Sequence, residues 1–371
     1  MKKEKVLVAM SGGIDSSVAA LLLHEQGYEV IGITMKTWDY STSGGARKTT
    51  GCCSLDDIND ARALAVELGF HHIILDIRAE FGDYIIDNFV DEYLAGRTPN
   101  PCVLCNTHIK WDALLKRADQ LGCKYIATGH YAQLRQENGR YVISKGKDEN
   151  KDQSYVLWGL TQESLARTLF PLGGFEKKEI RKMALDRGYQ ELSKKSESFE
   201  ICFVPDNDYR GFLKRKVEGL EEKVAGGNFI DTKGNILGKH QGYPFYTIGQ
   251  RKGLELAFGE PRYVISIDAA KNEVVLGVKE DLNCKEVFVK KPNLSKYSTI
   301  EGEMEVLSKI RYKDKGANSL ISMLPDGRLK IEFFENVQGV APGQSAVFYE
   351  GNDLIGGGFI ASPTPPKEGL S

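Results

Sequence analysis

Residues 6–17 read VLVAMSGGIDSS, and this stretch decides the fold of the chain. Four apolar residues in a row predict a buried strand, and two glycines then permit a turn that a residue with a Cβ would resist. From Asp15 onward the apolar residues have helical spacing, and Gly27 ends the run. A strand, a glycine turn and a helix N-terminus together form a site for an anion, most often phosphate.

The string SGGIDS at residues 11–16 separates this turn from other phosphate-binding turns. It lacks the Lys-Ser/Thr pair of the common P-loop, and no second glycine of the dinucleotide-binding spacing follows it. It resembles the PP-loop of the N-type ATP pyrophosphatases, which grip the pyrophosphate of ATP while a substrate oxygen is adenylated. The resemblance implies ATP as cofactor and a role for Asp15 in placing Mg²⁺. An ordinary strand-to-helix turn is the alternative interpretation.

The composition is that of an ordinary soluble chain, with 371 residues, 41% hydrophobic and 27% charged. This length suffices for two or three domains. No signal-peptide region and no apolar run approaching a membrane span is present, so we expect a cytoplasmic protein without a membrane partner. The formal net charge is −2, so nucleic-acid contacts must come from local basic patches.

The order of predicted elements favours an α/β fold with a doubly wound parallel sheet, resembling the adenine nucleotide alpha hydrolases. After the first strand and helix, the predicted strands cover residues 29–35, 71–77, 124–131 and 196–203, and a polar hairpin covers residues 133–150. The predicted helices cover residues 55–68, 79–94, 101–121, 151–160 and 176–187. The charges of the last helix are interpreted as a solvated face.

A change of character after Pro205 predicts further domains. Glycines and turn signals dominate residues 206–282, and short strands from Tyr263 onward predict a small β-barrel. We therefore expect a PP-loop ATP-binding catalytic domain at residues 1–205 and a central linker domain at residues 206–282. A C-terminal β-barrel domain with a frayed tail would cover residues 283–371.

Seven cysteines in a chain of this kind favour buried hydrophobes, metal ligands or catalytic thiols over structural disulfides. Cys102 and Cys105 fall in the first turn of the helix predicted over residues 101–121, three residues apart and on the same face. A helix N-terminus stabilises thiolates. An ordinary packed first turn is the alternative. No local geometry links Cys202 to this pair, so their proximity is a hypothesis.

Further candidates stand at strand ends and in a basic stretch. Met35 ends the second strand, where doubly wound sheets bind ligands, and Gly129 would let a nucleotide approach the backbone closely. His130 follows at a strand terminus. The pair His71-His72 is interpreted as surface residues, because neighbours in a strand point to opposite faces. In the modest basic patch over residues 285–315, Arg311-Tyr312 is the expected phosphate-and-stacking pair.

Six motifs in order identify a family. They are SGGIDS at residues 11–16, GRTPNPCVLCN at 96–106, ATGHY at 127–131, KDQSY at 151–155, EICF at 200–203 and GQRKGL at 249–254. Together they resemble the tRNA-specific 2-thiouridylases (MnmA family), and the match runs from the first strand to GGGF near the end of the chain.

This resemblance implies a tRNA-uridine 2-sulfurtransferase that replaces O2 of the wobble uridine with sulfur in tRNAs for Lys, Glu and Gln. ATP with Mg²⁺ would adenylate O2 and release pyrophosphate. Cys202 would carry a persulfide received from a sulfur-relay or cysteine desulfurase protein. Cys105 would be the nucleophile and would close a disulfide with Cys202. The implied partners are tRNA and this donor, with no DNA and no membrane. The resemblance also implies that the central linker domain at residues 206–282 is a tRNA-binding domain.

The resemblance also assigns binding residues. The implied ATP-binding residues are Ala9, Met10, Ser11, Gly12, Gly13, Ile14, Asp15, Ser16, Met35 and Gly129. Asn100, Pro101 and Cys102 would meet the target base, and the other implied tRNA contacts are His130, Lys151, Asp152, Gln153, Arg311, Tyr312 and Gln344.

Cys102 departs from the family pattern, because many members have Asp there, a candidate general base. The thiol puts that assignment in doubt. With Cys105 and Cys202 it also supplies three potential ligands for a [4Fe–4S] cluster with one open iron, which is the alternative route to the same thiolation. No other metal is assigned.

Three other readings of the chain stay open. The first is another PP-loop adenylating enzyme, which would need no cysteine pair. The second is a non-catalytic nucleotide-sensing or RNA-binding module with inert cysteines. The third is a structural zinc site formed by Cys102 and Cys105 with Cys52 and Cys53.

Overall fold

The computed structural model describes residues 3–38, 55–195, 201–204, 206–256 and 259–361. The chain divides into two compact units. The first unit comprises Met1–Ile86, Cys102–Asn207 and Asn352–Ile355, and the second comprises Asp87–Pro101, Asp208–Gly351 and Gly356–Ser371. The division into three domains with boundaries at residues 205 and 282 stays a prediction.

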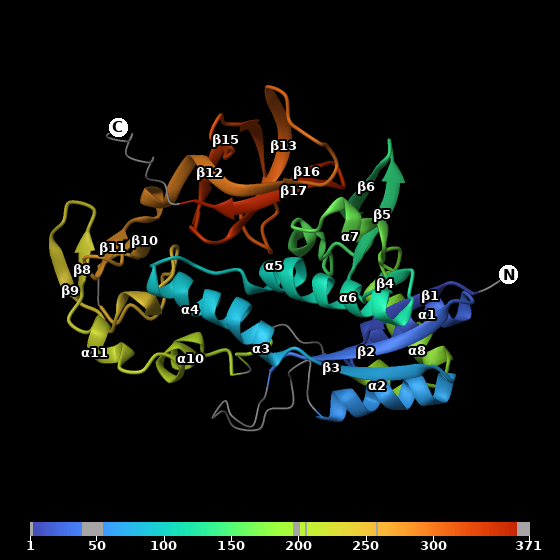
Figure 1. Cartoon of the computed structure of the whole chain (residues 1–371). Helices are drawn as coiled ribbons and strands as arrows, with labels where there is room; N and C mark the ends of the chain where they lie inside the picture. Colours follow the sequence, from blue (N-terminus) through green and yellow to red (C-terminus); the bar gives the residue numbers. More distant parts are fainter. Residues whose placement is uncertain (1–2, 39–54, 196–200, 205, 257–258, 362–371) are drawn as a thin grey trace. The chain divides into compact units, whose positions relative to one another are not determined.

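The first unit is built on a five-stranded parallel sheet with the strand order β3-β2-β1-β4-β7 (Figure 1). Its strands are β1 (Lys5–Ala9), β2 (Glu29–Lys36), β3 (His71–Asp76), β4 (Tyr125–Ala127) and β7 (Thr168–Leu169). Strand β1 pairs with β2 on one side and with β4 on the other. Because the strand order reverses at β1, the turn after β1 lies where doubly wound sheets bind ligands. The predicted fold class is confirmed.

Helices cover both faces of this sheet. Helices α1 (Ile14–Glu25) and α2 (Leu55–Leu68) pack against Val6 and Val8 in one apolar cluster. Helix α6 (Trp111–Leu121) contacts β1 and β4, and Figure 1 shows it on the other side of the sheet from α2. Val6, Leu7 and Val8 are therefore fully buried, which explains their unbroken apolar run.

The rest of the first unit surrounds the sheet. The antiparallel hairpin β5 (Ala132–Glu137) and β6 (Arg140–Lys145) confirms the predicted polar hairpin. The other elements are α3 (Arg78–Phe81), η2 (Gly82–Ile86), α5 (Pro101–Leu104), η3 (Cys105–Lys110), η4 (Ser154–Leu157), α7 (Gln162–Ala166), α8 (Lys177–Asp186) and α9 (Gln190–Lys194).

The second unit contains a four-stranded sheet and a closed six-stranded barrel. The sheet has the order β10-β11-β8-β9, and in the barrel the order β12-β15-β14-β13-β16-β17 is closed by pairing of β12 with β17. The first group is α4 (Asp87–Leu94), α10 (Tyr209–Lys216), α11 (Leu220–Val224), β8 (Asn228–Asp231), β9 (Ile236–Lys239), η5 (Tyr243–Phe245), β10 (Tyr263–Asp268), β11 (Glu273–Gly277) and η6 (Lys279–Leu282). The barrel strands are β12 (Asn283–Leu294), β13 (Glu303–Lys309), β14 (Ala317–Met323), β15 (Leu329–Gln338), β16 (Ser345–Glu350) and β17 (Asp353–Ile360). The predicted C-terminal β-barrel is confirmed.

Two predicted helices contain an unpredicted π-helical segment. The helix predicted over residues 79–94 consists of α3, the π-helical η2 and α4. The helix predicted over residues 101–121 consists of α5, the π-helical η3 and α6. A π-turn accommodates one extra residue in a helix, so it shifts the faces that side chains occupy, and such turns are frequent at functional sites.

Three other predicted elements were too long or wrong. The helix predicted over residues 151–160 is the single 3₁₀ turn η4, because the Asp152 carboxylate accepts from Gly146 N and Ser154 N and competes with helical bonding. The strand predicted over residues 124–131 ends at Ala127, and Tyr131 bonds instead with Gln153 through both its N–H and its carbonyl.

The strand predicted over residues 196–203 is also not formed where the structure describes it. Residues 196–200 lie outside the described part of the chain, and residues 201–204 form a turn in which Val204 N donates to Ile201 O over 2.9 Å. Phe203 is buried edge-on against Phe81, with ring centroids 5.8 Å apart. Burial of this side chain therefore comes from helix packing and not from a sheet.

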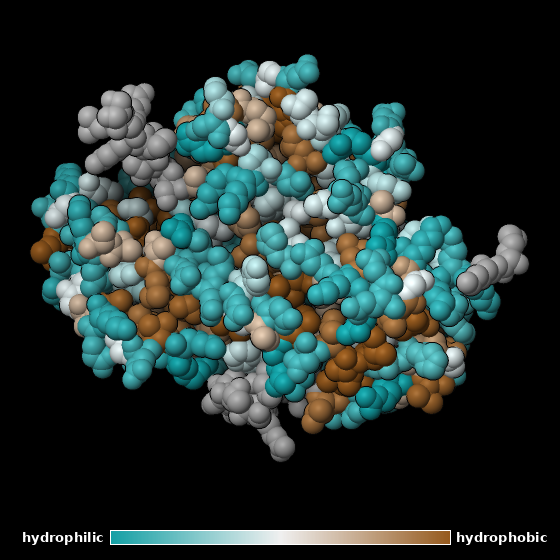
Figure 2. All heavy atoms as spheres, in the orientation of Figure 1, coloured by the Kyte–Doolittle hydropathy of each residue, from teal (hydrophilic) through white to brown (hydrophobic). Residues whose placement is uncertain are grey.

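Apolar residues gather on the visible surface over α2 and β3 (Figure 2). Leu55 and Val66 of α2 are 78% and 74% exposed, and Ile74 of β3 is 44% exposed. Within the described residues, no helix is both long enough and apolar enough to cross a bilayer.

Candidate active site

The turn between β1 and α1, residues 10–16, is the loop on which the site is built. Ser11 N donates to Ser16 Oγ over 3.0 Å, and the Ser16 hydroxyl donates to the Gly13 carbonyl over 3.2 Å. Gly13 precedes α1 in an extended conformation and gives the helix no side-chain cap. No described residue accepts from the N–H groups of Gly12, Gly13, Ile14 or Asp15. These donors at a helix N-terminus suit a bound anion.

The Asp15 carboxylate is held by two residues from other segments. Lys177 Nζ of α8 lies 2.7 Å from each carboxylate oxygen, and the Tyr131 hydroxyl donates to Oδ1 over 2.7 Å. Lys177 is only 7% exposed, so the interpretation of its helix as a wholly solvated charged face is wrong at this position. Ile14 and Tyr131 also share an apolar cluster with Ile180 of α8. Helix α8 therefore anchors the start of α1.

A hydrogen-bonded chain fixes the end of β1 from the neighbouring strands. Thr34 Oγ1 donates to Met10 O over 2.7 Å and therefore accepts from His72 Nε2 over 2.9 Å, so the proton of His72 resides on Nε2. Burial lowers the pKa of His72, and the nearby Arg62 adds to the effect. His71 is exposed as predicted, but the surface interpretation is wrong for the half-buried His72.

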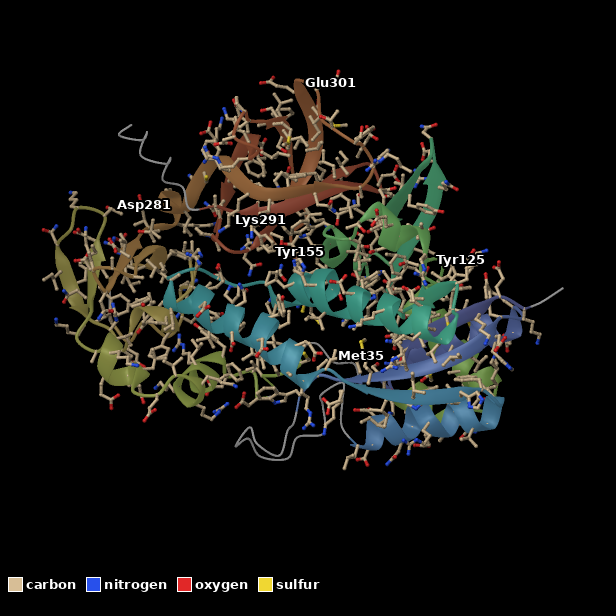
Figure 3. The ribbon with its side chains drawn as sticks, viewed as in Figure 1. Met35, Tyr125, Tyr155, Asp281, Lys291 and Glu301 are labelled. Atoms are coloured by element: carbon tan, nitrogen blue, oxygen red, sulfur yellow. The ribbon has the colours of Figure 1, made fainter. Side chains whose placement is uncertain are left out.

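Met35 lies at the same edge of the sheet as the loop. Met10 N donates to the carbonyl of Ile33 over 2.8 Å, and Met35 follows two residues later at the end of β2, where Figure 3 shows it. Its side chain is half-buried. The register therefore brings Met35 to the carboxyl ends of β1 and β2, as its predicted place beside a nucleotide requires.

Gly129 packs directly against the first turn of α1. A Cβ at this position would lie 2.9 Å from Ser16 N, so a larger residue would displace the loop. The next residue, His130, packs against Trp111 and Phe170 at centroid distances of 5.6 and 6.2 Å. Burial lowers the pKa of His130 to about 3, and the charge of Lys110 contributes. His130 is therefore neutral at physiological pH.

Cys102 and Cys105 differ in exposure, although both lie at the start of the same helical segment. Cys102 is exposed, whereas Cys105 is buried and begins the π-helical η3. The segment is fixed to its neighbours by Asn106 Nδ2, which donates to Val156 O over 3.0 Å, and by Trp111 Nε1, which donates to Thr168 Oγ1 over 2.8 Å. These bonds set the place of Cys105 in the fold.

Cys202 is partly exposed and lies in the turn at residues 201–204. Its neighbour Phe203 packs on Phe81 of α3, and α3 contacts η3, the segment that Cys105 begins. Helix α3 is therefore a common neighbour of the two segments that carry Cys105 and Cys202. Cys52 and Cys53, which would complete a zinc site, lie outside the described residues.

The predicted tRNA residues 151–153 connect to the loop through Tyr131. Tyr131 N donates to Gln153 Oε1 over 3.0 Å, and Gln153 N donates to the Tyr131 carbonyl over 2.9 Å. The Asp152 carboxylate accepts from the Ser154 hydroxyl over 2.9 Å. Asp152 and Gln153 therefore have clear structural partners, while Lys151 is half-exposed beside them.

The remaining predicted tRNA residues belong to the second unit. Gln344 Nε2 donates to the Pro99 carbonyl over 2.8 Å, next to the half-buried Asn100 and the buried Pro101. Arg311 is exposed and donates through Nη2 to Gln338 O over 3.3 Å, and Tyr312 is 41% exposed. The structure thus gives Gln344 a role in holding the segment before Asn100.

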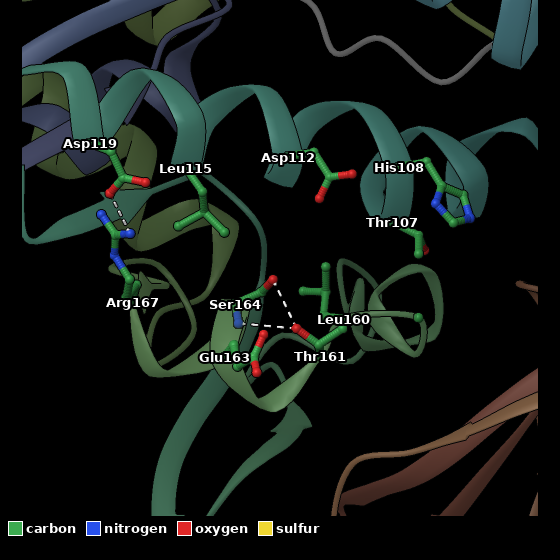
Figure 4. A pocket seen from close by; sticks show the side chains of 11 residues that line it. Thr107, His108, Asp112, Leu115, Asp119, Leu160, Thr161, Glu163, Ser164 and Arg167 are labelled. Atoms are coloured by element: carbon green, nitrogen blue, oxygen red, sulfur yellow. Dashed lines mark hydrogen bonds and ion pairs between the residues drawn. The ribbon is translucent and has the colours of Figure 1, made fainter.

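A separate pocket of about 510 Å³ lies between α6 and residues 159–167 (Figure 4). The Arg167–Asp119 ion pair and the Thr161–Ser164 hydrogen bonds flank it. None of the predicted site residues lines it. Among the described residues, no three His, Cys, Asp or Glu side chains are grouped closely enough to hold a metal ion.

Comparison with known proteins decides the family. Three family models match in order: the tRNA methyl transferase HUP domain at residues 4–206, the tRNA methyl transferase PRC-barrel domain at 211–278 and the aminomethyltransferase beta-barrel domain at 284–360. A curated protein of Amoebophilus asiaticus, named tRNA-specific 2-thiouridylase MnmA, is 64% identical over 97% of this chain and 96% of its own length. The chain belongs to the tRNA-specific 2-thiouridylase family.

Other relatives in the 2-thiouridylase family carry the same name. The protein of Cytophaga hutchinsonii is 63% identical over 97% of this chain and 98% of its own length. The protein of Salinibacter ruber is 57% identical over 97% of this chain and 94% of its own length. The family resemblance stated from the six motifs is therefore confirmed across nearly the whole chain.

Three residues beside the loop of this 2-thiouridylase family member were missed by sequence reasoning. Tyr131 stood inside the motif ATGHY but was given no role. Lys177 and Lys195 lie in charged stretches where no pattern separates a buried lysine from a solvated one. Only their ion pairs with Asp15 and with Asp57 reveal them.

Proposed function

We propose that this chain is a sulfurtransferase that makes 2-thiouridine in tRNA with the use of ATP. Its membership of the 2-thiouridylase family supports the reaction and the tRNA substrate. The observation that carries the proposal is the loop at residues 10–16, whose unoccupied N–H donors and uncapped helix suit the pyrophosphate of ATP. ATP binding is also consistent with the parallel-sheet fold.

In the first step, uridine O2 attacks the α-phosphorus of ATP and pyrophosphate leaves. The proposed ATP residues are those of the loop together with Met35 and Gly129. Backbone N–H groups at the start of α1 would hold the pyrophosphate, and the closeness of Gly129 to Ser16 would keep the adenosine near the backbone. Adenylation converts O2 into part of AMP, which is a good leaving group.

In the second step, the terminal sulfur of a persulfide on Cys202 attacks C2 of the base and AMP leaves. The Cys105 thiolate then attacks the sulfur of Cys202, which forms a Cys105–Cys202 disulfide and leaves the transferred sulfur on C2. A dithiol reductant must reduce this disulfide before the next turnover. The contact of α3 with η3 and its packing on Phe203 support proximity of the two cysteine segments. A sulfur-relay or desulfurase protein would supply the persulfide.

Neither Mg²⁺ nor an iron–sulfur cluster is assigned a set of protein ligands in this proposal. Both oxygens of Asp15 are bonded to Lys177, so we derive no magnesium step from Asp15 and leave Mg²⁺ as the counter-ion of ATP. We derive no step through an iron–sulfur cluster, because the described residues form no ligand group of three. Cys102 is exposed beside the proposed target-base residues Asn100 and Pro101, and a thiol there leaves the general base unassigned.

For tRNA, we propose contacts by the residues predicted from the family motifs. Exposed Arg311 and Tyr312 suit a phosphate and a stacked base. His130 is neutral, so its contact would be a hydrogen bond or stacking and not an ion pair. We propose the three-domain division at residues 205 and 282 and a cytoplasmic location as further parts of this function.

The function is tested by thiolation of tRNA transcripts with ATP and a persulfide donor, after anaerobic purification with iron and sulfide quantified. We expect Cys105→Ser and Cys202→Ser to abolish thiolation while tRNA binding and tRNA-dependent pyrophosphate release persist. Cys284→Ser is the matched control, because Cys284 is also partly exposed but lies in the barrel.

Each alternative has its own outcome. Full activity without iron supports the persulfide route, whereas a stoichiometric iron requirement would establish the cluster. If wild-type protein released pyrophosphate in the presence of tRNA but did not thiolate the tRNA, the chain would be another adenylating enzyme. If both cysteine variants kept full thiolation activity, the proposed roles of Cys105 and Cys202 would be wrong. If wild-type protein bound ATP and tRNA without any turnover, it would be a binding module.

A further inference from the structure

Lys195, which follows α9, contacts the loop at residues 10–16. Its Nζ donates to the carbonyl of Gly12 over 2.8 Å, although the two residues are 183 positions apart. It also forms ion pairs with Asp57, over 3.2 Å, and with Asp60, both in α2. One ammonium group therefore joins the loop to the helix behind it.

The loop has no free space on this side. Gly12 has φ +74°, and a Cβ there would lie 2.1 Å from the carbonyl oxygen of Asp57. The loop backbone thus rests directly on the first turn of α2. The Gly12 carbonyl points toward Lys195, and the N–H of the same peptide unit belongs to Gly13, one of the donors available to an anion. Fixing that carbonyl also fixes the direction of the donor.

The charges behind the loop make the ammonium necessary. Asp57 and Asp60 are three residues apart and share one face of α2. Without a cation, two carboxylates would stand behind a loop that binds a polyphosphate, and like charges at such distances repel. Burial alone would lower the pKa of Lys195, but its hydrogen bonds to Asp60 and Asp57 outweigh burial and raise that pKa. Lys195 is therefore protonated at physiological pH.

The backbone of Lys195 is anchored as well. Both terminal nitrogens of Arg181 lie 3.3 Å from the Lys195 carbonyl, and Nη1 also bonds the carbonyl of Ser193. Arg181 belongs to α8, the helix whose Lys177 holds Asp15. Helix α8 thus supports the loop twice, directly through Lys177 and indirectly through the place it gives to Lys195.

We propose that Lys195 is a positioning residue for ATP. It orients the Gly12–Gly13 peptide toward the phosphates and screens them from the carboxylates of Asp57 and Asp60. This inference rests on the proposed binding of ATP to the loop.

The test measures ATP affinity by calorimetry and tRNA-dependent pyrophosphate release on the full chain. We expect Lys195→Met to raise the Kd and the KM for ATP about tenfold or more, with a smaller change in kcat and unchanged tRNA affinity. In that background, Asp57→Asn together with Asp60→Asn should restore part of the affinity. Lys194→Met is the control, because the exposed Lys194 pairs with Glu191 on the surface of the same short helix.

The outcomes separate this inference from the proposed function. If wild-type protein does not bind ATP, the proposed function fails. If wild type binds ATP and Lys195→Met binds it equally well, the inference is overturned. If the asparagines restore nothing, the screening role is wrong. Should Lys195→Met not fold, Asp60→Asn alone carries the test: it should tighten ATP binding, and unchanged or weaker binding would overturn the screening role.

Discussion

Asp15 and Lys177 form an ion pair that links the first turn of α1 to α8. The Lys177 side chain is 9% exposed and that of Asp15 is 33% exposed. Removing one partner of a buried pair leaves the other charge desolvated, which costs more than the pair contributes when intact. Lys177 therefore binds both oxygens of Asp15, the carboxylate for which the sequence motif predicted a role in placing magnesium.

We expect Lys177→Met to lower the free energy of unfolding by about 2 kcal/mol, less than for a fully buried pair because Asp15 is partly exposed. Urea denaturation measures the change. Lys178→Met is the control, since Lys178 is 80% exposed at the neighbouring position and should change stability by less than about 0.5 kcal/mol. Adding Asp15→Asn to Lys177→Met should cost less than the sum of the two single changes, and strict additivity would contradict the coupling.

His130 gives a second residue-level prediction, on pH. Its pKa is lowered by burial to about 3, whereas in an unfolded chain a histidine titrates near pH 6.5. Below about pH 6.5 the unfolded state therefore binds more protons, and stability falls as the pH falls. We expect His130→Gln to lose less stability than wild type between pH 7 and pH 5, measured by urea denaturation at both values. An equal loss of stability in both proteins would mean that His130 binds a proton as readily in the folded chain as in the unfolded chain, so that its pKa is not lowered.

Among the elements, the helical segment from Pro101 to Leu121 shows what periodicity predicts and what it omits. The start at Pro101 and the end before Gly122, which has the left-handed φ of 67°, follow from proline and glycine preferences. The π-turn at Cys105–Lys110 depends on contacts with residues 154–168, which a local pattern does not contain.

Gly159 tests whether this packing sets the place of Cys105. A Cβ at Gly159 would lie 2.2 Å from Thr107 Oγ1 in the π-turn, so Gly159→Ala must displace the Thr107 side chain, and we expect η3 to shift with it. We expect a loss of about 1–3 kcal/mol of stability and slower thiolation with unchanged tRNA binding. Thr107→Ala added to Gly159→Ala should recover part of both losses. Gly174→Ala is the control, because nothing lies within 4 Å of a Cβ there, and a similar loss in it would remove the argument.

At the scale of the whole molecule, the two compact units predict how ATP affects stability. ATP would bind only to the first unit. A ligand present at 100 times its Kd raises the free energy of unfolding of the part that binds it by about 2.7 kcal/mol. We expect ATP to slow amide hydrogen exchange in β1, β2 and α1, with little change in the barrel strands β13–β15. Mass spectrometry of exchanged peptides measures this. Equal protection in the barrel would contradict a nucleotide site confined to the first unit.

The same two-unit structure limits what sequence order can predict. The short segments Asp87–Pro101 and Asn352–Ile355 each belong to a unit other than that of their chain neighbours. Compact units form by contact in space, so a boundary placed where composition changes does not locate such exchanges.

The sequence by itself determined the parallel sheet, the loop after β1, the barrel and the family, because apolar runs, glycine turns and ordered motifs are local properties of a chain. The helix predicted over residues 55–68, for example, matches α2 residue for residue. Tertiary structure alone decided which lysines are buried. It also placed Lys177 within hydrogen-bond distance of Asp15 and Lys195 within hydrogen-bond distance of Gly12. Residues 201–204 form a turn and not the predicted strand. These contacts join groups that are far apart in the chain, so no local pattern contains them. Burying a charged side chain costs free energy, and this cost is offset only when the fold places an opposite charge beside it.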